Sequence, residues 1–135
     1  ENAFVQVASK TIVDKRTLFI MELLESMTIV AYYTKQELCY LLIFRMVQFS
    51  LLHGMCESTP SAFSFYSVLL CGLFGDSKGG SFYGNLALDI LDHLQAQHKL
   101  ARAYVTLFNN VFVWSSPLNK CIEPLLKAYN VGMKS

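Results

Sequence analysis

His53 and Cys56 are the two residues whose types and spacing come nearest to a reactive site. They lie three positions apart, a spacing that suits either a pair of metal ligands or a cysteine–histidine catalytic pair. A metal site needs a second ligand pair at matching spacing, and a catalytic thiol needs a group that orients its histidine; the sequence offers neither. We therefore interpret His53 as a helix-end histidine and Cys56 as an incidental thiol.

The glycine-rich segment 75–80 is the nearest approach to a phosphate-binding loop. It lacks the glycine-to-lysine spacing of such loops, and no predicted strand precedes it. It is better interpreted as an inter-helix turn, with Asp76 capping the next helix. The four cysteines form no C-x-x-C pair and are expected as reduced thiols of a cytosolic protein. The sequence thus predicts no catalytic, cofactor-binding or metal-binding residue.

Charge and hydropathy exclude further classes. The 135 residues include 11 basic and 10 acidic side chains with no basic block, which argues against nucleic-acid binding. The charge-free stretches 58–75 and 103–119 contain serine, proline or asparagine, so they predict buried core helices rather than membrane insertion. No signal peptide is visible, and a cytoplasmic location is expected. A helical bundle associated with a membrane remains one alternative interpretation of the chain.

The hydrophobic periodicity predicts an all-α chain of about six helices in three antiparallel pairs, over residues 14–53, 59–95 and 98–132. Glu22, Glu25 and Ser26 mark the polar stripe of the first helix. Thr59 and Pro60 open the third helix, Gly54 stops the second, and Pro124 should kink or delay the sixth. Pairs that recur about every forty residues suggest a tetratricopeptide-like α-solenoid segment.

The candidates for a structural or interface role are Glu37, Arg45 and Trp114. Thr34 and Glu37 have the T-x-x-E spacing of a capping box at the start of the second helix. That helix is apolar nearly all round, which predicts central burial, and Arg45 is the cation within it. A structural ion pair is the favoured interpretation of Arg45, with an interdomain contact as the alternative. Trp114 is the third candidate.

The chain resembles the helical region of very large multidomain signalling kinases. These proteins join a serine/threonine-kinase-like domain, an AAA-type ATPase, a tetratricopeptide-like region, a GAF domain and a sensor histidine kinase. The resemblance begins near Met21, and the chain departs from it at Gln48-Phe49 and at 77–80. The matching stretches are Ala31-Tyr32 with Glu37-Leu38, Phe44-Arg45-Met46-Val47 with Ser50-Leu51 and Gly54, Glu57-Ser58, Leu69-Leu70-Cys71-Gly72 with Gly75-Asp76, Tyr83-Gly84 with Leu86-Ala87-Leu88, Phe108-Asn109-Asn110, Trp114 with Pro117-Leu118, and Pro124-Leu125-Leu126 with Ala128-Tyr129 and Gly132.

The resemblance implies that residues 1–135 are a single non-catalytic helical-repeat segment cut from a longer chain. Such a segment would couple or position ATPase and kinase domains, and ATP would bind only in those other domains. Its expected partners are neighbouring domains of the same chain, and a protein or peptide. The composition points the same way, since 53% hydrophobic with 16% charged residues leaves more apolar surface than one domain of this size covers. The alternative is a free-standing all-α ligand-binding or enzymatic domain.

Overall fold

The computed structural model describes residues 10–134, and this part of the chain is all-α, as predicted. Thr11 and Met55 form one isolated parallel β-bridge. The helices of the described residues are α2 (Lys15–Thr34), α3 (Gln36–His53), α4 (Thr59–Gly72), α5 (Ser77–Leu94), α6 (Gln97–Asn110), α7 (Phe112–Ser115) and α8 (Leu118–Gly132).

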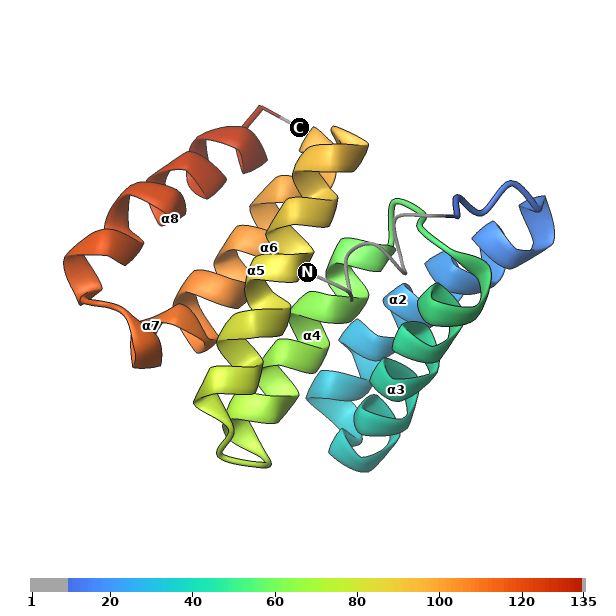
Figure 1. Ribbon diagram of the computed structural model, residues 1–135, viewed down its shortest axis with the longest axis horizontal. Coiled ribbons are helices and arrows are strands. Elements are labelled where there is room, and N and C mark those ends of the chain that lie inside the picture. Colours follow the sequence, from blue (N-terminus) through green and yellow to red (C-terminus); the bar gives the residue numbers. More distant parts are fainter. Residues whose placement is uncertain (1–9, 135) are drawn as a thin grey trace.

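Six of these helices lie as three antiparallel pairs in a row (Figure 1). The pair α2–α3 stands at one end of the row, α4–α5 in the middle, and α6–α8 at the other end, with short α7 at the corner between α6 and α8. Short links join the helices of the first two pairs, and a link of this length leaves no choice but an antiparallel neighbour.

The core is centred on the α4–α5 pair. Phe63, Ile90, Leu107 and Val111 are almost fully buried there, where α4, α5 and α6 meet. The central burial predicted for the second helix is wrong, because α3 lies at the end of the row and leaves five large apolar side chains exposed. These are Leu38, Leu41, Phe44, Leu51 and Leu52. An apolar surface on every side of a helix does not say which side is covered.

Two predicted helix starts are displaced. Thr34 is the last residue of α2, where its hydroxyl donates to the Val30 carbonyl at 2.9 Å, so the Thr34–Glu37 capping box does not form. A helical residue lacks the extended backbone of an N-cap, and Lys35 takes that position without a side-chain bond. Thr59 is already inside α4, and its hydroxyl instead accepts the Cys56 amide at 3.0 Å.

Other predicted ends are confirmed. The Asp76 carboxylate accepts the Gly79 amide at 2.8 Å and caps α5, while Gly54 ends α3 with a φ of 103°. That positive φ favours glycine. The predicted fifth helix divides at Val111 into α6 and α7, whereas α8 continues through Pro124.

The close packing around Gly84 predicts different effects for substitutions at two glycines. A Cβ on Gly84 would lie 3.1 Å from Phe112 Cζ, 3.1 Å from Ser67 Oγ and 3.2 Å from Leu107 Cδ2. We expect Gly84→Val to lower the free energy of unfolding by about 1 to 3 kcal/mol, because three buried neighbours must shift. Gly72 ends α4 with nothing within 4 Å of such a Cβ. Gly72→Ala should therefore leave that free energy unchanged or raise it by up to about 1 kcal/mol. Urea unfolding of both variants tests this, and equal losses would contradict it.

Candidate functional site

Glu25 is the one acidic side chain of the described residues that the fold buries. It shares the inward face of α2 with Met21, Thr28 and Ala31, and only 2% of it is exposed. A buried carboxylate is unfavourable unless cations and hydrogen bonds surround it. Its surroundings are therefore the first place to look for chemistry.

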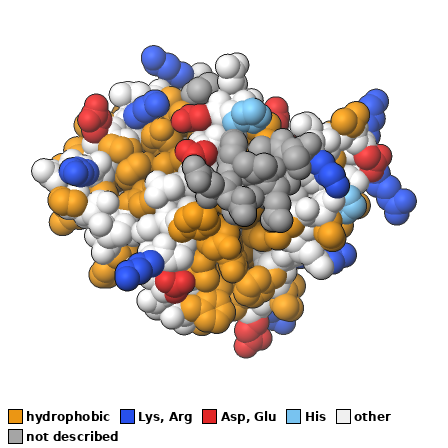
Figure 2. All heavy atoms as spheres, in the orientation of Figure 1, with side chains coloured by type: hydrophobic (Ala, Val, Ile, Leu, Met, Phe, Trp, Pro, Cys, Tyr) orange, Lys and Arg blue, Asp and Glu red, His pale blue; other side chains and the backbone are white. Residues whose placement is uncertain are grey.

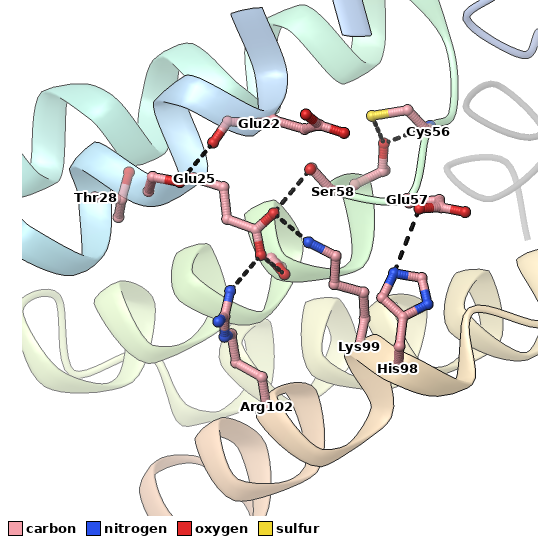
Figure 3. Close-up of polar contacts among 12 residues, drawn as sticks. Glu22, Glu25, Thr28, Cys56, Glu57, Ser58, His98, Lys99 and Arg102 are labelled. Atoms are coloured by element: carbon pink, nitrogen blue, oxygen red, sulfur yellow. Dashed lines mark hydrogen bonds and ion pairs between the residues drawn. The ribbon is translucent and has the colours of Figure 1, made fainter. Parts of the chain in front are cut away.

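Four side chains from two other helical regions surround this carboxylate (Figure 3). Ser58 Oγ, at the entrance to α4, donates to Oε2, and Ser61 Oγ donates to Oε1, each at 2.8 Å. From α6, Lys99 Nζ and Arg102 Nη1 donate to Oε2 and Oε1, also at 2.8 Å. Lys99 and Arg102 are three residues apart, so one face of α6 presents both cations. We call these five residues the Glu25 cluster.

The partners of Glu25 decide its protonation. Burial raises the pKa of the carboxyl group, but the hydrogen bonds from Lys99, Ser61 and Ser58 together outweigh it and hold the pKa below its ordinary value. Both carboxylate oxygens already accept two bonds each. A general base needs a free oxygen in reach of a substrate, so this geometry suits a structural role. The cluster joins α2 to the start of α4 and to α6.

A weaker ion pair lies beside the cluster at the surface. His98 Nε2 is 3.4 Å from Glu57 Oε2, and both side chains are more than half exposed. Solvent screens such a pair, which contributes little to stability. It nevertheless places a second contact between the α3–α4 link and α6, next to Lys99 (Figure 3).

The structure does not bring the three predicted candidate residues together. Arg45 is exposed; its Nη1 donates to Gln48 Oε1 at 2.6 Å, and its guanidinium lies 4.8 Å from the centre of the Phe49 ring. Among the described residues Arg45 forms no ion pair, and its exposed place on α3 lets the cation reach water. Glu37 is exposed in the first turn of α3, where its charge suits the helix dipole. Trp114 lies on α7 at the far side of the row and is 76% exposed.

The thiols and histidines form no reactive constellation. The described residues contain no group of three or more side chains able to hold a metal ion. The His53 ring packs against Phe49, while the buried Cys56 sulfur lies 3.6 Å from Thr59 Oγ1. Burial raises the pKa of Cys39 and Cys71, which keeps these thiols protonated. Thiolate chemistry is disfavoured at both.

Two exposed apolar stripes mark opposite ends of the row. Along α8 and its C-cap residue, large apolar side chains recur every three or four residues, and each is more than half exposed: Leu118, Ile122, Leu126, Tyr129 and Met133. On α2 the equivalent stripe contains Phe19, Leu23, Met27, Val30 and Tyr33. The hydrophobic atoms over the α8 end are visible at the left of Figure 2. Such patches on a monomer indicate contact with another molecule or segment.

Glu25 was missed by the sequence analysis, which placed it on a polar stripe with Glu22 and Ser26. The available signal was its register, since Met21 and Thr28 lie four residues before and three after it, on the same side of the helix. Its two cations are 74 and 77 residues away along the chain. No spacing rule connects residues so far apart.

Comparison with known proteins gives no relative. No protein-family model matches the chain, and neither curated proteins nor solved structures give a significant match. Among the described residues, no helix is both long and apolar enough to span a membrane.

Removing the buried charge should destabilise the fold. We expect Glu25→Gln to lower the free energy of unfolding by about 2 to 3 kcal/mol, because Lys99 and Arg102 lose their counter-ion. Both cations can still reach water, which limits the loss. Glu22→Gln, at an exposed site one turn earlier, is the matched control and should change that free energy by less than about 0.5 kcal/mol. Equal effects of the two substitutions would contradict a special role for Glu25.

The Glu25 cluster also predicts an acid dependence. Folding lowers the pKa of Glu25 below its ordinary value of 4.5, so the folded state binds the proton less tightly than the unfolded state. Its stabilisation is complete above pH 4.5 and is lost as the pH falls through the folded pKa. The difference in unfolding free energy between the wild type and Glu25→Gln should therefore shrink from pH 7 to pH 3. Asp14, whose pKa is also lowered, contributes equally to both proteins and cancels. A difference that is constant with pH would contradict the prediction.

Proposed function

We propose that the chain is a non-catalytic helical-repeat scaffold that holds neighbouring protein elements at the two ends of its row of helix pairs. The exposed apolar stripe of α8 carries this proposal. The apolar side of α8 is broader than α6 covers: Cys121 and Ala128 are buried, while five larger apolar residues beside them stay exposed. Burying such a stripe against another helix would be favourable.

The packing inside the molecule indicates what would cover that stripe. α4 packs on α3, and α6 packs on α4 and α5, so each pair supports the first helix of the next. A groove of about 470 Å³ runs along the packed α6–α8 pair, and Tyr129 and Met133 of the stripe belong to its lining. Its lining includes Ala101, Ala128 and Gly132, whose small side chains let a helix approach closely. A further helix in this groove would extend the row by the same packing.

In the larger protein that the sequence resembles, the covering elements are neighbouring domains of the same chain. The scaffold would then couple an ATPase and a kinase module by fixing their separation and orientation. Stacked helix pairs suit this role because each contacts only its neighbours and the stack stays extended. The Glu25 cluster adds a contact beyond this nearest-neighbour pattern, because it ties the first pair to the third and so fixes the orientation of the pairs.

The sequence coding for the neighbouring segments tests the finer proposal. We expect an ATPase phosphate loop encoded before Glu1 and a histidine-kinase module encoded after Ser135. A start codon directly before Glu1 together with a stop codon directly after Ser135 would contradict it. The chain would then be a free-standing helical domain.

The docking role of α8 predicts that the wild-type chain self-associates more strongly than a variant with a charge in the α8 stripe. We expect the isolated chain to fold and to associate at high concentration, because the stripe then finds only other copies. Ile122→Glu should raise the dissociation constant at least about tenfold, since a buried charge opposes the contact. Asn130→Glu adds the same charge to an exposed position of the same helix and should leave that constant unchanged. Sedimentation velocity over a concentration series measures both, and a wild-type chain that stays monomeric throughout would contradict the proposal.

A further inference from the structure

A cavity unrelated to the Glu25 cluster or to the apolar stripes lies where the end of α4, the start of α5, the end of α6 and α7 meet. Its volume is about 690 Å³, within the range of small-molecule sites. Its lining includes Val68 and Cys71 of α4, Ser77 of α5, Asn109 and Asn110 of α6, and Trp114 of α7.

The lining of this cavity contains no charged side chain. A phosphate or carboxylate ligand would find no cation there, and an ammonium ligand would find no carboxylate. The raised pKa of Cys71, due first to burial and then to the Asp76 charge, keeps its thiol neutral as well. The cavity therefore suits an uncharged ligand.

The polar groups of the cavity match hydroxyl groups. A carboxamide carries a donor and an acceptor side by side, and a serine hydroxyl is both. Asn110 Nδ2 donates to the Thr106 carbonyl at 2.9 Å, which fixes that side chain and leaves its Oδ1 as an acceptor. Asn109 and Ser77 line the cavity and are exposed, so each can donate a hydrogen bond to a ligand or accept one from it. A ligand hydroxyl, which both donates and accepts, uses all of these groups.

Trp114 supplies a flat apolar surface beside those groups. The indole is 76% exposed. Its helix is nevertheless anchored, because Val111 and Phe112 at the start of α7 are buried in the core. The Trp114 amide donates to the Val111 carbonyl at 3.1 Å, and the Ser116 amide donates to the Phe112 carbonyl at 2.8 Å. The backbone that carries the indole is thus part of a short helix whose first residue is packed in the core, and the side chain lines the cavity. An exposed aromatic ring of this kind stacks on the apolar face of a ligand.

We propose that this cavity binds a neutral polyhydroxylated molecule of the saccharide class. Trp114 stacks on the C–H face of one sugar ring, while Asn109, Asn110 and Ser77 bond its hydroxyl groups. This site would make the chain a ligand-responsive scaffold, yet its evidence is independent of the docking role of α8. The two proposals can fail separately, because the cavity and the α8 stripe share no residue.

Because the chain has a single tryptophan, ligand binding at this cavity can be followed by indole fluorescence. Trp114 is the single tryptophan, so all indole fluorescence comes from the site. Titration of the chain with maltose and with cellobiose should give a saturable change in emission for at least one of them. Adenosine, whose adenine ring is a neutral planar stacking surface, and adenosine monophosphate, which is an anion, should bind more weakly than that sugar.

Two variants separate site binding from other causes. Asn109→Ala keeps the fluorescent reporter, and we expect it to weaken sugar binding at least about tenfold, because a paired hydroxyl loses its partners. Tyr129→Ala removes another exposed aromatic residue, on α8, and should leave the affinity unchanged. The proposal is overturned if neither sugar gives a saturable change, if adenosine or its monophosphate binds more tightly, or if Asn109→Ala binds sugar like the wild type.

Discussion

The buried carboxylate of Glu25 is the constraint on which the arrangement of the three helix pairs depends. A charge in that position is unfavourable unless it is fully paired, so α2 can pack inward only where Ser58, Ser61, Lys99 and Arg102 converge on it. Apolar packing alone tolerates sliding between helices, because one aliphatic contact is much like another. The four hydrogen bonds to the two carboxylate oxygens of Glu25 do not tolerate such sliding, because each would be broken by it. The cluster therefore specifies the register of the first pair against the second and third.

The same constraint explains why the row can leave its ends open. The largest apolar cluster is centred on the α4–α5 pair, and the Glu25 cluster adds polar contacts between α2, the start of α4 and α6. The outer sides of α2, α3 and α8 are then not needed to hold the fold together. Their apolar residues are available for another element, which is the physical basis of the scaffold proposal. In this respect the chain differs from a self-contained bundle, whose apolar sides all face inward.

Local signals in the sequence predicted the local features of the fold. The all-α class follows from hydrophobic periodicity, and Asp76 and Gly54 end their helices where residue type alone suggested. Errors arose where two signals competed: Thr34 has the type of a cap, yet α2 continues through it because only one residue separates α2 from α3. The role of Glu25, the exposure of Arg45 and the cavity beside Trp114 all depend on which helices become neighbours. That information resides in contacts between distant residues, which composition and spacing do not contain.

The wide separation of the cluster along the chain has a consequence for synthesis on the ribosome. Ser58 and Ser61 follow Glu25 by 33 and 36 residues, whereas Lys99 and Arg102 follow by 74 and 77. As the chain emerges, α2 can therefore meet the start of α4 well before either cation exists. In that interval the carboxylate has only hydroxyl partners, and burying it is still unfavourable. The nascent first two pairs must stay loosely docked until α6 arrives, so the chain locks into register only when its third pair is made.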